Sequence, residues 1–113
     1  MTRYLFDSEL AELNSEMIEM GSLIEQAIES AIQALIHQDV EIARKTISDD
    51  ETVDAQERKI EALCLKLLMQ QQPVARDLRT ISSALKMITD MERVGDHAAD
   101  ISEIILMMDG KPY

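Results

Sequence analysis

Residues that interrupt helices are scarce in this chain, and their scarcity constrains the fold more than any other sequence feature. Among 113 residues there are two prolines and three glycines. Proline breaks a helix interior, and glycine weakens it by about 1 kcal/mol relative to alanine. Over the long stretches that lack both, apolar side chains recur at the 3.6-residue spacing of an amphipathic helix. The sequence therefore predicts an all-α fold.

Turn and capping residues divide the chain into three expected helices. They cover residues from about 7 to 37, from about 40 to 71 and from about 74 to 108. Asp7 or Ser8 is expected to cap the first helix and Asp39 the second, because short polar side chains accept hydrogen bonds from the free N–H groups of a first turn. Pro73 ends the second helix and begins the third. The segment 109–112, Asp-Gly-Lys-Pro, is typical of a helix stop.

The short connections predict that neighbouring helices run antiparallel, as an up-down-up three-helix bundle that forms one domain over residues 1–113. One face of the third helix suits the core of this bundle and carries Leu78, Ile81, Leu85 and Ile88. A second apolar stripe lies elsewhere on the same helix and carries Met87, Met91, Val94, Ala98, Ile101 and Ile105. Two apolar faces suggest burial on two sides, so we expect another helix from a partner chain or a missing domain.

The net charge of −11 limits the classes of partner. Binding to nucleic acid or to an anionic membrane surface needs clustered lysine and arginine, so neither is expected, whereas a cation or a basic partner surface fits. The sequence has no run of about 18 apolar residues and no stretch that resembles a signal peptide. The single cysteine, Cys64, lies on an apolar helix face. We therefore expect a soluble cytoplasmic protein without membrane insertion, with Cys64 buried as a small apolar side chain.

Acidic residues recur on one side of the expected second helix. They are Asp50, Asp54, Glu57 and Glu61, which fall within about 60° of one another on a regular helix. Like charges at this spacing repel by a few tenths of a kcal/mol per pair. The row lies at the edge of the apolar arc and not on the evident solvent side, so we expect it to face a neighbouring helix.

A second acidic row continues the apolar stripe of the third helix. At about 100° per residue, the positions that follow Ile88 on this stripe are Glu92 and Asp96, and Asp100 and Glu103 extend the row. An acid on an apolar stripe is costly unless a partner compensates its charge. Two acids on neighbouring turns, both directed inward, therefore suggest a bound cation.

Carboxylates from facing helices form multinuclear metal sites in helical bundles. All-oxygen ligation suits magnesium, manganese, calcium or ferric iron better than zinc or copper. His97 directly follows Asp96 and so points about 100° away from it, which makes it a poor candidate for a ligand. The alternative is a solvated acidic face whose acids pair with Arg76, Arg79 or Arg93. The sequence shows no nucleophile–base pair, phosphate loop or oxyanion motif.

Three segments of the chain form a pattern that is specific when they are taken together. They are DETVDAQERKIEALC over residues 50–64, QQPVARDLR over residues 71–79 and LKMITDMERVGDHA over residues 85–98. In this order and at this spacing they resemble the phosphate-uptake regulator family, PhoU. The resemblance covers essentially the whole chain and is weakest in the first helix.

The resemblance implies tandem three-helix bundles and a regulatory activity without catalysis. PhoU proteins are cytoplasmic negative regulators of the phosphate-starvation response that also restrain phosphate uptake. They couple PstB, the ATPase of the phosphate ABC transporter, to the sensor kinase PhoR. Family members bind multinuclear metal clusters through Glu/Asp-x-x-x-Asp motifs, with iron, manganese, magnesium or zinc as the expected ions here. Carried over to this chain, the metal ligands are Asp50, Asp54, Glu57, Glu61, Glu92, Asp96 and Asp100.

The chain has one bundle, whereas family members usually carry two in about twice this length. We therefore expect the N-terminal half of a two-repeat protein or a single-repeat relative, with a homodimer replacing the missing contact. Arg76, Asp77 and Arg79 are candidates for partner binding, and intramolecular caps and ion pairs are the alternative for them. Two other functions stay open, a carboxylate-bridged metalloenzyme and a metal-free helical adaptor. The missing Glu-x-x-His motif argues against the enzyme.

Overall fold

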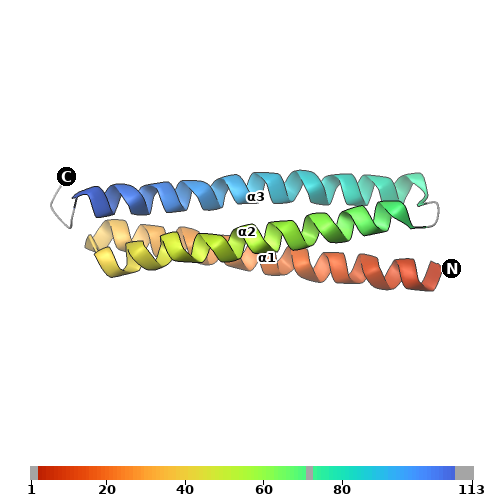
Figure 1. Ribbon diagram of the computed structural model, residues 1–113, viewed down its shortest axis with the longest axis horizontal. Coiled ribbons are helices and arrows are strands. Elements are labelled where there is room, and N and C mark those ends of the chain that lie inside the picture. The colour runs from red at the N-terminus through yellow and green to blue at the C-terminus, as the bar shows by residue number, and fades with distance from the viewer. Residues whose placement is uncertain (1–2, 71–72, 109–113) are drawn as a thin grey trace.

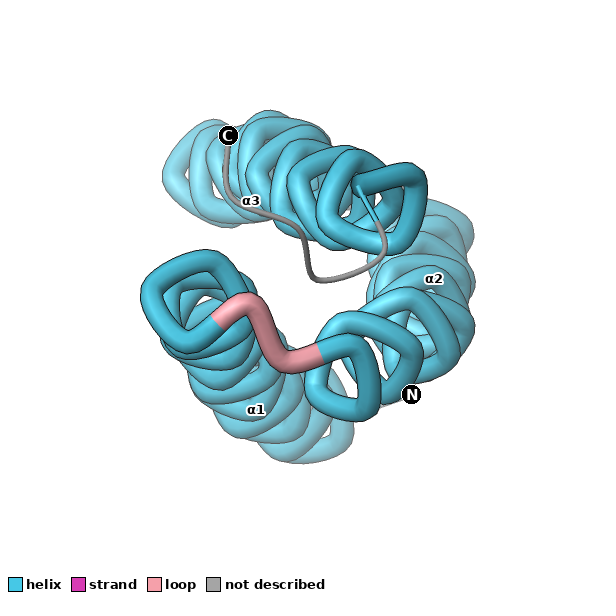
Figure 2. The backbone as a smooth tube through the Cα atoms, turned by 90° about the vertical axis from the view of Figure 1, so that its left-hand side faces the viewer, coloured by secondary structure: helices cyan, strands magenta, loops and turns pink. Residues whose placement is uncertain are grey.

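The computed structural model describes residues 3–70 and 73–108, with side chains from residue 5 onward, and these residues form three long helices (Figure 1). α1 spans Arg3–His37, α2 spans Val40–Met69 and α3 spans Ala75–Met108. Each helix contacts both others, and α2 runs antiparallel to α1 and α3. The bundle measures 59 × 17 × 16 Å, and the view along it in Figure 2 shows the three helices around a common axis. The all-α, up-down-up bundle predicted from the sequence is therefore confirmed.

The first helix begins about one turn earlier than predicted. Asp7 and Ser8 lie inside α1 and do not cap it. Phe6, in the additional turn, is only 3% exposed and packs in the core. Burying an aromatic ring stabilises this turn, an effect that the local capping pattern does not reveal.

The ends of the other helices lie close to their predicted positions. α2 ends at Met69, because Gln70 has an extended backbone and its N–H donates a hydrogen bond to the carbonyl oxygen of Leu67. The predicted helix end at Gln71 and the predicted stop at 109–112 lie outside the described residues.

Two aspartates cap helix starts. Oδ1 of Asp39 accepts hydrogen bonds from the N–H groups of Glu41 at 3.0 Å and Ile42 at 3.2 Å, which confirms the predicted cap of α2. Oδ2 of Asp77 accepts one from the N–H of Val74 at 3.1 Å, in the manner of a capping box. Both caps compensate N–H groups that have no partner within the helix.

The core contains apolar side chains from all three helices. The large side chains with the least exposure are Met20, Ile60, Leu67, Ile81 and Ile88. Cys64 is fully buried in the same cluster, as predicted, and burial raises the pKa of its thiol. A smaller cluster of Ala34, Ala43 and Ile105 closes the other end of the bundle.

The buried face of α3 is rotated relative to the prediction. Ile81 and Ile88 are buried as expected, but Leu78 is 42% exposed. The capping carboxylate of Asp77 occupies the buried position of this turn in its place. Because of this rotation, Glu92 lies at the edge of the buried face and not at its centre.

The second apolar stripe of α3 is only partly covered. Ala98 and Ile105 are buried within the bundle, whereas Met87, Val94 and Ile101 are 51%, 39% and 39% exposed. Another helix over this stripe therefore stays a prediction. None of the described helices is both long and apolar enough to cross a membrane.

The glycines of α1 and α3 have different surroundings, so we expect different results when each is replaced by alanine. A Cβ added at Gly21 would have nothing within 4 Å, whereas one at Gly95 would lie 3.2 Å from Cδ1 of Ile24 and 3.3 Å from Cγ1 of Val53. Gly21→Ala should raise the free energy of unfolding by up to about 1 kcal/mol, the helix-propensity difference. Gly95→Ala should show no such increase in the free energy of unfolding, because the added Cβ overlaps with the side chains of Ile24 and Val53. Urea denaturation measures both, and an equal increase would contradict the close packing at Gly95.

Candidate metal centre

Gly95 allows α3 to approach the other two helices closely at the level of the acidic rows. A Cβ added there would meet Ile24 of α1 and Val53 of α2, and it would lie 3.6 Å from Oδ1 of Asp50. The close approach therefore brings this part of α3 next to the acids of α2. Gly95 is absent from the sequence-based predictions. The signal for it is a lone glycine inside an uninterrupted helical pattern, which often marks close packing.

Five carboxylates from α2 and α3 converge, and we call them the carboxylate cluster: Asp50, Asp54, Glu57, Glu92 and Asp96. They form two groups of three. One oxygen each of Asp50, Asp54 and Asp96 lies within 4.8 Å of the others, and the same holds for Asp54, Glu57 and Glu92. Asp54 belongs to both groups. The structure thus brings together the inner members of the two acidic rows.

The cluster strongly perturbs the protonation of Glu92. Its pKa is raised to about 7 from the ordinary value of 4.5. Partial burial is the largest cause, followed by a hydrogen bond with Asp96. The negative charges of Asp96, Glu57 and Asp54 act in the same direction, because each disfavours a further negative charge nearby. Glu92 therefore carries a proton through much of the acidic pH range.

The pKa values of two acids of α2 are raised for similar reasons. Burial, and then the charges of Asp54, Asp96 and Asp100, raise the pKa of Asp50. Burial also raises the pKa of Glu57, with further contributions from nearby acids, and only Arg58 opposes this increase. The cluster is therefore an electrostatically strained concentration of negative charge.

Two predicted ligands lie outside both groups of three. Glu61 is exposed on α2 and acts on the cluster through the effect of its charge on Glu57. Asp100 is exposed on α3 and acts in the same way on Asp50. His97 is also exposed and belongs to neither group. The two outer acids are thus placed at the ends of the cluster and not within it.

No described residue neutralises the cluster through an ion pair. The ion pairs of the described chain join Arg44 to Glu41, Lys45 to Asp49, Lys59 to Glu16, Lys66 to Glu9 and Lys86 to Asp90. Arg76, Arg79 and Arg93, the arginines considered as partners for the acids, take part in none of them. The alternative of an acidic face paired with these arginines therefore has no support among the described contacts.

The donor chemistry of the cluster fits a cation. It offers only carboxylate oxygens, the ligands that hard cations prefer. A cation placed among them would offset the repulsion between the acids, which adds to the effect of burial on the pKa of Glu92. The two groups that share Asp54 provide two sets of ligands next to one another.

A polar contact between α1 and α2 does not follow from the sequence pattern. Gln56 donates hydrogen bonds to the backbone oxygen of Glu16 at 2.9 Å and to its carboxylate at 2.8 Å. Lys59 lies 3.1 Å from the same carboxylate. The hydrogen bonds from Gln56 and Lys59 lower the pKa of Glu16, so this acid is stabilised in its charged form. Glu16 thus has a direct basic partner, which none of the described residues provides for the acids of the cluster.

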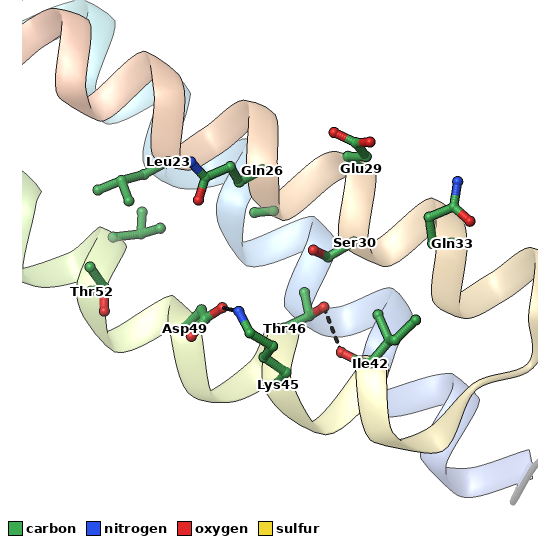
Figure 3. Close-up of a pocket in the computed structure, with 12 residues that line it drawn as sticks. Leu23, Gln26, Glu29, Ser30, Gln33, Ile42, Lys45, Thr46, Asp49 and Thr52 are labelled. Carbon is green, nitrogen blue, oxygen red and sulfur yellow. Dashed lines mark hydrogen bonds and ion pairs between the residues drawn. The ribbon is translucent and has the colours of Figure 1, made fainter.

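A groove of about 560 Å³ also lies between α1 and α2, but its surroundings do not resemble the cluster (Figure 3). Gln26 and Gln33 of α1 lie across it from Lys45 of α2. Lys45 is paired with Asp49 at 2.6 Å, and the hydroxyl of Thr46 donates to the carbonyl of Ile42 at 2.8 Å. No carboxylate of the cluster lines this groove. The cluster lies instead where α2 faces α3.

The three residues predicted to bind a partner separate into two kinds. Asp77 is 2% exposed and caps α3, which favours the intramolecular alternative for this residue. Arg76 and Arg79 are exposed and line a second groove, between α1 and α3. A partner contact at the two arginines stays a prediction.

Residues 17–105 match the PhoU domain family, which covers most of the chain. The chain belongs to the PhoU family. Its PhoU domain therefore includes all five acids of the carboxylate cluster. The resemblance seen in the three sequence segments is confirmed.

Curated PhoU relatives are similar over nearly the whole chain. A phosphate-specific transport system accessory protein PhoU homolog of Clostridium acetobutylicum is 42% identical over 100% of the chain and 52% of its own length. The homolog of Aquifex aeolicus is 38% identical over 92% of the chain and 47% of its own length. The PhoU protein of Edwardsiella tarda is 36% identical over 89% of the chain and 42% of its own length. The chain spans about half the length of the curated relatives it matches.

Proposed function

We propose that this PhoU chain is a regulator of phosphate transport that acts through protein contacts and binds cations in its carboxylate cluster. Its relatives are named as accessory proteins of the phosphate-specific transport system, which supports a regulatory role in phosphate transport and not an enzymatic one. The observation that carries the cation site is the pair of carboxylate groups that share Asp54 and have no paired base among the described residues.

The proposed cation is bound by Asp50, Asp54, Glu57, Glu92 and Asp96, with Glu61 and Asp100 at the periphery. All-carboxylate ligation favours manganese, magnesium or iron, and zinc is the remaining candidate. A bound cation ties α2 to α3 and compensates charges that otherwise repel one another across the helix interface. In this proposal the metal is a structural and regulatory element of the bundle.

The proposed partners are the transporter ATPase PstB and the sensor kinase PhoR, and the proposed location is the cytoplasm. These assignments rest on the family resemblance. The single bundle is proposed to be one repeat of a longer arrangement or to pair as a homodimer. The exposed apolar stripe at Met87, Val94 and Ile101 supports a further contact of this kind.

A metal-free helical adaptor is the second candidate function. It is favoured by the pKa of Glu92, which at about 7 lets the cluster reduce its charge by holding a proton and not a metal ion. The two candidate functions predict different metal contents. Replacing the carboxylates should lower the bound metal of a cation-binding regulator, whereas a metal-free adaptor holds no metal before or after the change, and elemental analysis distinguishes them.

Phosphate uptake in cells tests the regulatory role. We expect expression of this chain in a bacterium that lacks its own PhoU gene to lower radiolabelled phosphate uptake and the activity of a phosphate-starvation reporter. Asp54→Asn should lose this effect, whereas Glu51→Gln, which removes an exposed charge from the same helix, should retain it. Unchanged uptake and reporter activity with the wild-type chain present at normal levels would contradict the proposal.

A further inference from the structure

A second groove lies between the first halves of α1 and α3, and we call it the α1–α3 groove. Its volume is about 450 Å³, and its walls include Leu10 and Met17 of α1 and Met87 of α3. Arg76 and Arg79 also line it. Met87 and the cluster residue Glu92 are about 140° apart around α3, so the groove and the carboxylate cluster lie on different sides of this helix.

Apolar surface continues along both helices beyond this groove. Seven-residue steps return to nearly the same side of a helix, so Val94 and Ile101 follow Met87 along α3. On α1, the same step leads from the lining residue Asn14 to Gly21 and Ile28. Ile28, Val94 and Ile101 are each 39% exposed, and Gly21 leaves open space where a Cβ would lie. From Arg76 to Ile101 this surface is about 37 Å long, which matches a helix of about 25 residues.

The charge at one end of this surface is unusual for the chain. The sequence has 22 acidic and 11 basic residues, yet none of the described residues that line the α1–α3 groove is acidic. Five basic residues elsewhere form ion pairs with acids. Arg76 and Arg79 are exposed and take part in none of these pairs. Within the described part of the chain, the groove therefore presents positive charge without a paired acid, beside an apolar floor.

We propose that the α1–α3 groove binds an amphipathic helix of a partner protein whose apolar side chains fill the groove and whose acidic side chains reach Arg76 and Arg79. This proposal rests on the proposed role as an interaction protein, and it adds the chemistry of the partner. A helix that places anchors at steps of three, four and seven residues suits a long groove between two helices. Complementary charge at one end then sets the orientation in which the helix binds.

Binding of a designed peptide tests the proposal. The probe is a fluorescein-labelled amphipathic peptide of about 25 residues, with leucines on one face and glutamates at one end, and the comparison peptide has lysines in place of the glutamates. At an ionic strength of about 0.15 M, where the field of the net charge of −11 is screened beyond about 8 Å, we expect the glutamate peptide to bind the full chain about tenfold more tightly, because it pairs with the two arginines at short range whereas the lysine peptide is repelled by them. Fluorescence anisotropy measures both dissociation constants.

Charge-reversal variants locate the binding site. Arg76→Glu/Arg79→Glu should abolish or reverse the preference for the glutamate peptide, and it should leave the fold intact because acids are favourable in the first turns of a helix. Arg44→Glu/Arg93→Glu changes the net charge equally, on exposed positions outside the groove, and should retain the preference. Gly21→Leu places a side chain into the open space and should weaken binding of both peptides. Circular dichroism confirms that each variant is folded.

Two results would overturn the proposal. One is an equal affinity of the wild-type chain for both peptides. The other is self-association of the wild-type chain in sedimentation velocity that Arg76→Glu/Arg79→Glu abolishes, which would make the groove an interface between two copies. If either occurs while the chain still lowers phosphate uptake in cells, only the partner assignment fails and the regulatory role stands.

Discussion

Manganese should raise the melting temperature of the metal-free protein by about 10 °C. A ligand that binds only the folded state stabilises it by about 2.7 kcal/mol at a concentration of 100 times its dissociation constant. In a domain of about this size, each kcal/mol shifts the melting temperature by several degrees. The carboxylate cluster provides this differential binding, because its acids are brought together only when α2 packs against α3. Differential scanning fluorimetry after removal of metal by chelation measures the shift.

Asp54, which belongs to both carboxylate groups, should contribute most to the manganese-dependent shift in melting temperature. Asp54→Asn should remove most of the manganese-dependent stabilisation, since it takes one charged ligand from each group. Glu51→Gln removes the same charge from the exposed side of α2 and should leave the shift unchanged. Equal shifts in both variants would mean that manganese binds elsewhere or acts by general screening.

Without metal, the protein should become less stable between pH 5 and pH 8. The folded chain holds a proton on Glu92 up to about pH 7, whereas an unperturbed glutamate loses it near pH 4.5. Between these values the folded state binds more protons than the unfolded state, so the free energy of unfolding falls as the pH rises. The raised pKa values of Asp50 and Glu57 act in the same direction. After allowance for solvent screening around partly exposed groups, we expect Glu92 to account for about 1 kcal/mol, or about 5 °C.

Replacing the carboxylate of Glu92 by a neutral amide isolates the contribution of this residue to the pH dependence of stability. Glu92→Gln should melt at a higher temperature than the wild type at pH 8 when both are metal-free, and its melting temperature should depend less on pH. The same variant should lose stabilisation by manganese. Glu103→Gln, at an exposed position on α3 outside the cluster, should behave like the wild type. A variant with the wild-type pH dependence would show that burial and the neighbouring acids raise the pKa of Glu92 less than the structure indicates.

The helical fold could be predicted because its signals are local. The cap at Asp39, the break near Pro73 and the apolar periodicity of each helix depend only on nearby residues. The predictions that were wrong, the start of α1 and the buried face of α3, concern features that depend on tertiary contacts. Phe6 extends α1 because its ring finds a place in the core, and Leu78 lies outside the core because the capping carboxylate of Asp77 takes the buried position.

The members of the candidate site could also be predicted, but their grouping could not. Spacing on a single helix places Asp54 and Glu57 on one side of α2 and Glu92 on one side of α3. It does not give the relative rotation and offset of two helices, which decide that Asp54 joins both groups while Glu61 lies outside them. Gly95 controls this approach through the absence of a side chain, and a pattern of acids and apolar residues does not reveal it.

Metal content decides whether the acids of α2 and α3 bind metal together. The wild-type protein and Glu92→Gln/Asp96→Asn are dialysed against manganese and then against metal-free buffer, and bound metal is measured by elemental analysis. We expect at least one ion to be retained per wild-type chain and none in the double variant, with both proteins folded. A wild-type protein without metal, or equal metal in the two proteins, would show that the carboxylate cluster is not a metal site.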